Sequence, residues 1–144
     1  MIAIRAASRS DQPAIEALLL ADGLPTLGLD AAMDTAVVAH DDGRLVGCAA
    51  VEIYGPAGLL RSVCVAPAIR GTGLGRKLVI EAETMARQLG VEELFLLTET
   101  AIEWFPRLGY VPDRREVAPA QLQASPEFAG ACPDTARLLR KRLG

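Results

Sequence analysis

A run of small residues near the middle of the chain has the composition of a phosphate-binding loop. The segment is Arg70-Gly71-Thr72-Gly73-Leu74-Gly75, and it stands between an apolar run at residues 59–65 and a helical pattern at residues 76–89. Glycines let the backbone approach an anion closely, and the N–H groups that open a helix have no internal acceptors. With Arg70 and Arg76 at its ends, the loop is predicted to bind a pyrophosphate group.

Two common phosphate-binding motifs do not fit this segment. A P-loop ends in Lys-Ser or Lys-Thr after its last glycine, whereas Gly75 is followed by Arg76 and Lys77. A Rossmann loop follows the first strand of its unit and has an acidic residue about 20 positions further on, at the end of the second strand. Glu92 and Glu93 stand near that distance but precede the next predicted strand. A strand-to-helix turn that binds no ligand remains the alternative.

The loop and the strand before it resemble the acetyl-CoA-binding motif of the GNAT acetyltransferases. In that family a strand ending Val-x-Val-x-Pro leads into Arg/Gln-x-x-Gly-x-Gly/Ala. The matching residues of this chain are Val63, Val65, Pro67, Arg70, Gly73 and Gly75. A second family motif, which ends in Leu-Gly-Phe/Tyr, is matched at residues 98–110. The resemblance implies an α/β (α+β) fold with a mixed, mostly antiparallel sheet flanked by helices, and one acetyltransferase domain over residues 1–144.

Acetyl-CoA is the cosubstrate that this resemblance implies. Its pantetheine arm would lie where two central strands splay apart, at residues 59–65 and 94–98. Backbone groups of Val63 and Val65 would pair with the pantetheine amides, and one N–H would polarise the thioester oxygen. The predicted cofactor-binding residues are Val63, Val65, Arg70, Gly71, Thr72, Gly73, Leu74, Gly75 and Arg76.

The residues for acid–base chemistry depart from the family pattern. Many members have a glutamate base four residues before the last valine of the strand, but this chain has Arg61, which cannot accept a proton. Many also have a tyrosine that protonates the departing thiolate, where this chain has Phe105. An amine attacks only as the neutral nitrogen, so another group must take its proton. Glu52 and Glu99, near strand ends, are the predicted candidates, although each can be a solvated carboxylate instead. The remaining candidates are Glu103, Tyr54, Tyr110 and a water chain.

Residues 94–110 resemble the acetyltransferase domain of N-acetylglutamate synthase, which acetylates the α-amine of an amino acid. The acceptor is therefore predicted to be a small-molecule amine, an amino acid or an analogue of one. Arg61, Thr98 and Arg115 are its predicted contacts, because a guanidinium group can donate two hydrogen bonds to one carboxylate. Exposure to solvent on an edge strand is the alternative for Arg115 and for Arg114 beside it.

The C-terminal segment, residues 119–143, is similar to the ArsN-type acetyltransferases of arsenic-resistance operons. This similarity implies an arsenic- or phosphorus-containing glutamate analogue as acceptor. Arsenic bound directly by thiolates is a less favoured alternative, because the three cysteines lie far apart and form no Cys-x-x-Cys motif. Cys48 and Cys64 are expected to meet across the sheet as buried thiols, Cys132 is expected to be buried too, and no metal site is predicted.

Around these motifs the pattern of apolar residues predicts alternating strands and helices. The predicted strands cover residues 2–6, 35–40, 44–53, 59–65 and 94–97, with a tight turn at residues 41–43. One helix follows a cap at Ser10 and Asp11, a short helix is expected within residues 23–34, and a third helix spans residues 73–89. Gly90 is predicted to end that third helix.

Composition narrows the classes of function. The chain has 144 residues, an apolar content of 51% and a formal net charge of −3, and it has no apolar run long enough to span a membrane. We therefore expect a cytoplasmic enzyme with no nucleic-acid or membrane partner, and pairing into a homodimer stays open. The basic residues of the last element, at positions 137 and 140–142, are expected to be solvated. The alternative functions are a non-catalytic acyl-CoA-binding or sensing module and a protein N-acetyltransferase.

Overall fold

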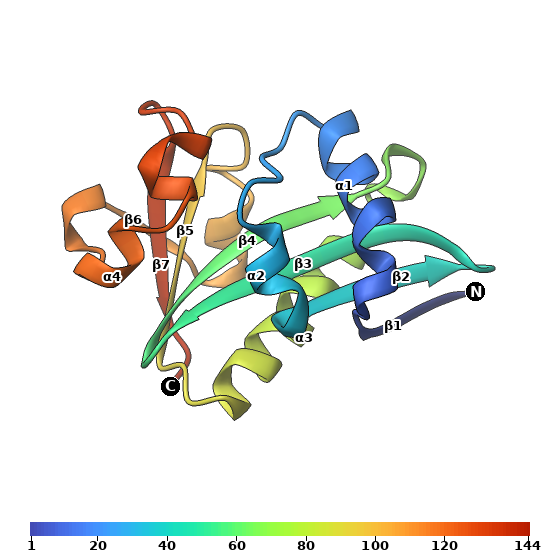
Figure 1. Cartoon of the computed structure of the whole chain (residues 1–144), viewed down its shortest axis with the longest axis horizontal. Coiled ribbons are helices and arrows are strands. Elements are labelled where there is room, and N and C mark those ends of the chain that lie inside the picture. The colour runs from blue at the N-terminus through green and yellow to red at the C-terminus, as the bar shows by residue number, and fades with distance from the viewer.

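A seven-stranded sheet forms the centre of the computed structural model, which describes residues 1–130 and 132–144 (Figure 1). The strands are β1 (Ile2–Ala6), β2 (Ala36–Asp41), β3 (Arg44–Tyr54), β4 (Ala57–Val65), β5 (Glu93–Thr98), β6 (Val111–Asp113) and β7 (Arg137–Arg142). Their order across the sheet is β1-β2-β3-β4-β5-β7-β6. The β4–β5 pair is parallel and the other pairs are antiparallel. The sheet is therefore mixed and mostly antiparallel, as predicted.

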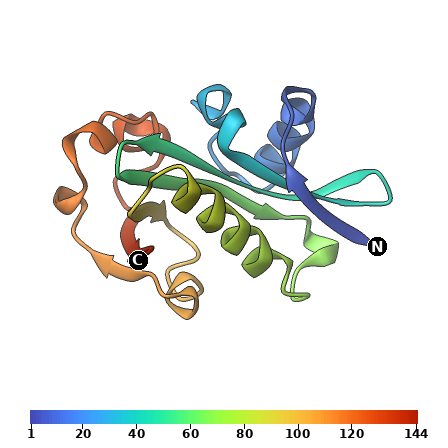
Figure 2. The ribbon, with the colours of Figure 1, turned by 90° about the horizontal axis from the view of Figure 1, so that it is seen from below.

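Helices cover both faces of this sheet (Figure 2). The α-helices are α1 (Gln12–Ala21), α2 (Leu29–Ala32), α3 (Leu74–Gln88) and α4 (Ala120–Gln123). Shorter helical turns are η1 (Arg9–Asp11), η2 (Met33–Thr35), η3 (Pro67–Ile69), η4 (Phe105–Leu108), η5 (Arg115–Val117) and η6 (Glu127–Ala131). On one face α3 buries Leu78 and Ala82 in the largest apolar cluster, whereas α1 buries Ile15 and Leu19 on the other. Helices α1 and α3 each pack an apolar stripe against the sheet.

Local turn signals in the sequence are confirmed. Asp42 and Gly43 connect β2 to β3 with positive φ angles of 50° and 81°, the conformation that a two-residue hairpin turn needs. Gly90 has a φ of 92° just after α3, and its N–H donates to the carbonyl of Arg87 while that of Val91 donates to the carbonyl of Ala86. This pair of bonds closes the helix end.

Strands β4 and β5 pair over only a short stretch and then separate. Their parallel register runs from Ala57 opposite Glu93 to Leu59 opposite Phe95, although both strands continue beyond these residues. On its opposite edge β4 pairs with β3, and the register of that pair shifts. Ser62 of β4 has a left-handed φ of 58°. A bulge of this kind bends the bulged strand. The bend and the short register together open a gap between the two central strands, as the family resemblance implied.

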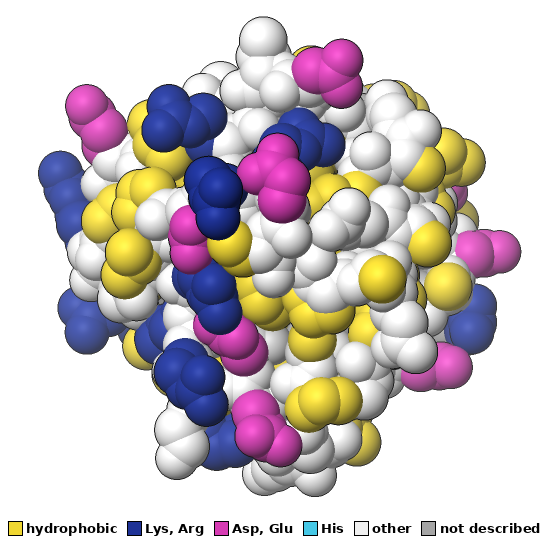
Figure 3. Space-filling view, turned by 90° about the vertical axis from the view of Figure 1, so that its left-hand side faces the viewer, with side chains coloured by type: hydrophobic (Ala, Val, Ile, Leu, Met, Phe, Trp, Pro, Cys, Tyr) yellow, Lys and Arg dark blue, Asp and Glu magenta, His cyan; other side chains and the backbone are white. Residues whose placement is uncertain are grey.

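Charged side chains tie β7 to the strands on both sides of it. Arg140 contacts Glu93 of β5 at 2.7 Å and Asp113 of β6 at 3.1 Å, and its guanidinium lies over the ring of Phe95. On the face that carries α4 and β6, acidic and basic side chains alternate (Figure 3). The expectation of a simply solvated basic cluster is therefore wrong for Arg140.

The expectation is also wrong for Lys141, which forms a partly buried network under α3. Its ammonium contacts the buried carboxylate of Glu83 at 3.0 Å and donates to the carbonyl of Leu108 at 2.7 Å. The hydroxyl of Tyr110, itself 1% exposed, donates to Glu83 at 2.8 Å. Burial, with Glu83 beside it, raises the pKa of Tyr110. These contacts join α3, β7 and the Gly109 turn, and they leave Tyr110 unsuited to act as a base.

The contacts of Glu83 with Lys141 and Tyr110 predict unequal effects of two substitutions on stability. Lys141→Met should lower the free energy of unfolding by about 3 kcal/mol, because it leaves a buried carboxylate without a cation. Tyr110→Phe should cost only about 1 kcal/mol, because Glu83 keeps its ion pair. Urea unfolding followed by circular dichroism measures both. A cost for Lys141→Met no larger than about 1 kcal/mol would show that the ion pair does not stabilise the fold.

Candidate active site

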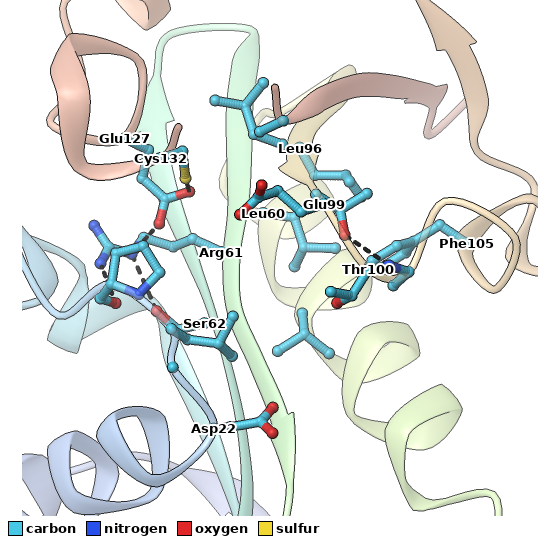
Figure 4. A pocket seen from close by; sticks show the side chains of 18 of the residues that line it. Asp22, Leu60, Arg61, Ser62, Leu96, Glu99, Thr100, Phe105, Glu127 and Cys132 are labelled. Carbon is cyan, nitrogen blue, oxygen red and sulfur yellow. Dashed lines mark hydrogen bonds and ion pairs between the residues drawn. The ribbon is translucent and has the colours of Figure 1, made fainter. Parts of the chain in front are cut away.

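The gap between β4 and β5 forms a cleft of about 680 Å³ (Figure 4). One wall holds β4 and the C-terminal segment, with Arg61 and Glu127, and the other holds β5 and the loop after it, with Glu99 and Phe105. The lining residues are 22–25, 60–63, 70, 96–101, 105, 127, 132, 133 and 136. The cleft therefore lies where the sequence placed the pantetheine arm.

The predicted phosphate loop lies at the start of α3 and is shaped to receive an anion. Gly71 and Gly73 have φ angles of 83° and 88°, and a Cβ built at either would meet no heavy atom within 4 Å. The first residue of α3 is Leu74, and the earliest hydrogen bond of the helix runs from Lys77 N to the carbonyl of Gly73 at 3.2 Å. The N–H groups of the first three helical residues therefore have no acceptor within the helix. This open, glycine-lined helix start fits the pyrophosphate of coenzyme A.

The other loop residues hold the cradle in place. The Thr72 hydroxyl donates to the carbonyl of Ile69 at 2.7 Å, and Leu74 is buried in the core. A Cβ on Gly75 would lie 3.2 Å from the ring of Trp104, so glycine allows this close packing. Arg76 is exposed at the helix start. The predicted loop residues thus divide into those that are exposed at the helix start and those that support the loop.

Arg70 connects the loop to β4 and to Asp22, the residue that follows α1. Its Nε donates to the carbonyl of Val65 at 3.1 Å, and its Nη2 contacts Asp22 at 2.8 Å. Val63 lines the cleft, and β4 has no register with β5 at this level. Val63 therefore lines the cleft without a neighbouring strand, whereas the carbonyl of Val65 already accepts a hydrogen bond from Arg70.

The predicted base Glu52 lies buried beside the cleft and is not among its lining residues. Its carboxylate accepts hydrogen bonds from Arg61 at 2.8 Å, from Ser125 at 2.7 Å and from the hydroxyl of Tyr54. Burial and the bond to Glu52 raise the pKa of Tyr54 to about 12. These contacts favour a role for Glu52 as the counterion of Arg61.

Arg61 lines the cleft, but its side chain is fully buried. Besides Glu52, its guanidinium contacts the hydroxyl of Ser62 at 3.1 Å and the carbonyl of Pro25 at 3.4 Å. Its predicted role, the binding of an acceptor carboxylate, would require these contacts to rearrange, because none of the side chain is exposed.

The opposite wall carries two of the predicted residues. Glu99 is exposed, lines the cleft and accepts a hydrogen bond from Thr135 at 2.8 Å. Thr98 also lines the cleft, and its hydroxyl accepts from the N–H of Ala101 at 3.0 Å. Phe105, in the position of the usual tyrosine, presents an apolar ring to the cleft. The structure therefore brings Thr98, Glu99 and Arg61 to one cavity.

Arg115 lies outside this group. Its Nη1 donates to the carbonyls of Pro133 and Ala136, both at 3.2 Å, and its guanidinium stands 5.5 Å from the centre of the Phe128 ring. It does not line the cleft. The contacts make Arg115 a support for the C-terminal segment rather than a group free to meet an acceptor, and they differ from the solvated edge position that was the alternative.

Sequence reasoning missed Glu127, which lines the cleft although it is only 4% exposed. Its carboxylate lies 3.5 Å from Nε of Arg61 and accepts from the thiol of Cys132 at 3.6 Å. Burial raises the pKa of Glu127, a change that Arg61 opposes. The sequence indicates Glu127 only indirectly. A buried arginine such as Arg61 needs carboxylate partners, but the sequence does not show which carboxylates these are.

The cysteines lie where the sequence placed them. Cys48 and Cys64 are register partners across β3 and β4, and both are buried, as is Cys132. Burial raises the pKa of Cys48 to about 12 and that of Cys64 to about 11. Among the described residues, no three or more His, Cys, Asp or Glu side chains are placed to hold a metal ion.

Comparison with known proteins identifies the family. A family model described as "Acetyltransferase (GNAT) domain" matches residues 33–112, which is more than half of the chain. The chain belongs to the GNAT acetyltransferase family.

Curated relatives share part of the sequence. An amino-acid acetyltransferase of Aeromonas salmonicida is 32% identical over 97 residues, which are 66% of this chain and 22% of that protein. An amino-acid acetyltransferase of Ralstonia nicotianae is 40% identical over 77 residues, or 52% of this chain and 17% of that protein. The chain thus spans about a fifth of the length of the curated relatives it matches.

Solved structures are similar over nearly the whole chain. N-acetylglutamate synthase from Neisseria gonorrhoeae, complexed with coenzyme A and N-acetyl-glutamate, aligns with a TM-score of 0.86 and 25% identity over 100% of this chain and 35% of that one. Rv2747 from Mycobacterium tuberculosis, in complex with CoA, aligns with a TM-score of 0.79 and 25% identity over 97% and 98% of the two chains. Separately, no helix of the described chain is long and apolar enough to cross a membrane.

The shape of the cradle predicts the effect of a side chain at Gly73. Gly73→Val should weaken acetyl-CoA binding by more than about 100-fold, because its side chain fills the space in front of the helix start. Gly43→Val is the matched control, since Gly43 has a φ of 81°, equally open surroundings and a distant position in the β2–β3 hairpin.

Isothermal titration calorimetry measures the affinity of both variants, and thermal unfolding reports the strain that they share. Unchanged affinity in Gly73→Val would show that the cradle assignment is wrong. Equal losses of affinity in the two variants would point to strain alone.

Proposed function

We propose that this protein is an acetyl-CoA-dependent N-acetyltransferase whose acceptor is the amine of an amino acid or a close analogue. The observation that carries the proposal is the glycine cradle at the start of α3, which directly follows Arg70, a residue that lines the β4–β5 cleft. The binding of coenzyme A by two structural relatives of 25% identity supports the cosubstrate. The names of the curated relatives support an amino-acid acceptor.

The residues of the cleft have separate tasks in this reaction. Acetyl-CoA supplies a thioester with an electrophilic carbonyl carbon. An N–H of β4 near Val63 would hold the carbonyl oxygen, which gains negative charge as the amine attacks. Phe105 cannot donate a proton, so the thiolate of coenzyme A would leave unprotonated and take its proton from solvent. Among the sequence-predicted bases, Glu99 is the one that lines the cleft.

The chemical identity of the acceptor can be specified further only from sequence similarity. An arsenic- or phosphorus-containing glutamate analogue is the narrower proposal, and it is supported by the C-terminal motif alone. Thr98 lines the cleft and is retained as a proposed acceptor contact. Arg61 is retained on the condition that one of its protein contacts is released.

A non-catalytic module that binds acyl-CoA is the second candidate function. It is favoured by Arg61 and Phe105, which stand where many relatives have a glutamate base and a tyrosine acid. The cleft nevertheless carries carboxylates from other elements, which a binding module does not need.

The proposal predicts release of coenzyme A thiol that depends on an amine acceptor. Purified protein with acetyl-CoA should release thiol when incubated with members of a panel of amino acids, their amides, and arsinic and phosphinic glutamate analogues. A thiol reagent follows the release, and mass spectrometry should find the acetylated amine.

Two controls accompany this assay: omission of the acceptor, and the Gly73→Val variant. Binding of acetyl-CoA without turnover of any amine in the panel would favour the non-catalytic function. Release that is independent of acceptor would indicate hydrolysis of the thioester instead.

A further inference from the structure

We propose that Glu127 binds the acceptor's ammonium group and receives its proton, and that the cleft therefore selects amines without net negative charge. A neutral or basic amino acid is thereby favoured over the anionic glutamate analogue that the C-terminal motif alone supports. The inference rests on the proposed acetyltransferase function and names the group that makes the acceptor reactive.

Two carboxylates around one arginine are bonded unequally. Arg61 lies between Glu52 and Glu127, at 2.8 Å and 3.5 Å respectively. Glu52 also accepts hydrogen bonds from Ser125 and Tyr54, and it is not among the residues that line the cleft. Glu52 is therefore fully occupied by its protein partners.

Glu127, in contrast, has two long contacts and an open side. Its oxygens contact the guanidinium of Arg61 at 3.5 Å and the weakly donating thiol of Cys132 at 3.6 Å. A buried carboxylate normally gains short, charge-assisted hydrogen bonds. Because Glu127 lines the cleft, an ammonium group there could supply them. The cleft wall that carries Glu127 faces Glu99 and Thr100 across the cavity (Figure 4).

The charged side chains that line the cleft include more carboxylates than cations. Asp22, Glu99 and Glu127 line it on the acidic side, and Arg61 and Arg70 are its lining cations. Arg61 is held by Glu52, and Arg70 by Asp22 at 2.8 Å.

Each lining cation therefore already has a carboxylate partner. A dicarboxylate would bring two negative charges near Glu99 and Glu127 with no cation that lacks such a partner, which is unfavourable in a partly buried site. A neutral or basic amino acid, or an amide of one, avoids this repulsion.

The chemistry of Glu127 suits proton transfer. It faces Arg61 from β4, Glu52 from β3 and Cys132 from its own segment. Its pKa is raised by burial, which brings a carboxylate closer to the basicity that proton acceptance needs.

Two protons leave the ammonium nitrogen in the proposed step. The first passes to Glu127 and then to water, and it frees the lone pair. The second leaves as the C–N bond forms and the C–S bond breaks. The electron pair of the C–S bond departs on sulfur, and solvent returns a proton to that thiolate.

The experiment compares acceptors of one shape and different charge. Glutamate, glutamine and glutamine amide serve as acceptors for the wild type, Glu127→Gln, Glu127→Asp and the control Glu116→Gln, an exposed position on η5. We expect the wild type to prefer glutamine and its amide over glutamate by at least about tenfold in kcat/KM.

The variants separate a direct role from a structural one. Glu127→Gln should lower kcat/KM for glutamine by roughly 100-fold and reduce the discrimination against glutamate, while acetyl-CoA affinity and the melting temperature stay near wild type. Glu127→Asp keeps the charge and should recover part of the activity. Glu116→Gln should behave as wild type. Wild-type kinetics in Glu127→Gln, or a preference for glutamate, would overturn the proposal.

Failure of the proposed function is distinguishable from failure of this inference. If the wild type turns over none of the three amines, the same amines are titrated into protein saturated with coenzyme A. Glutamine or its amide should still bind, and Glu127→Gln should bind it more weakly. Absence of binding to the wild type, or equal binding to Glu127→Gln, would reject the role of Glu127.

Discussion

The early end of pairing between β4 and β5 is the constraint on which the rest of the structure depends. After Leu59 and Phe95 the strands no longer share hydrogen bonds, yet each keeps a partner on its outer side. β3 supports β4, and β7 pairs with β5 from Glu93 to Thr98. The sheet can therefore open in its middle while most backbone groups stay bonded. The bulge at Ser62 adds the bend that keeps the opening wide.

The opening also determines the direction in which a bound cofactor would extend. Because β4 leads through η3 into the loop before α3, the same strand delivers cleft residues and the anion-binding helix start. α3 packs on the sheet through Leu78 and Ala82, so its direction is set by the core. A cofactor that binds the helix start is thereby directed along β4.

Features encoded by neighbouring residues were predictable from the sequence. The hairpin at Asp42-Gly43, the span of α3 and its end at Gly90 each depend on a few adjacent side chains and backbone angles. The loop from Arg70 to Gly75 belongs to this group. In contrast, the role of Lys141 and the placement of Arg115 depend on partners far away in the chain, Glu83 and the carbonyls near Ala136. No local pattern selects such partners, so Lys141 was expected to be solvated, and Arg115 was expected to contact the acceptor or, as the alternative, solvent.

Arg61 links the part of the site that was predictable to the part that was not. A cation in place of the usual glutamate removes a carboxylate from β4, and its complete burial then requires anionic partners. The fold supplies Glu52 from β3 and Glu127 from the C-terminal segment, more negative charge than one arginine neutralises. Since Glu52 is satisfied by other donors, the surplus falls on Glu127 at the cleft surface. The substitution that seemed to remove a carboxylate from the site thus accounts for another one there, contributed by a different element of the fold.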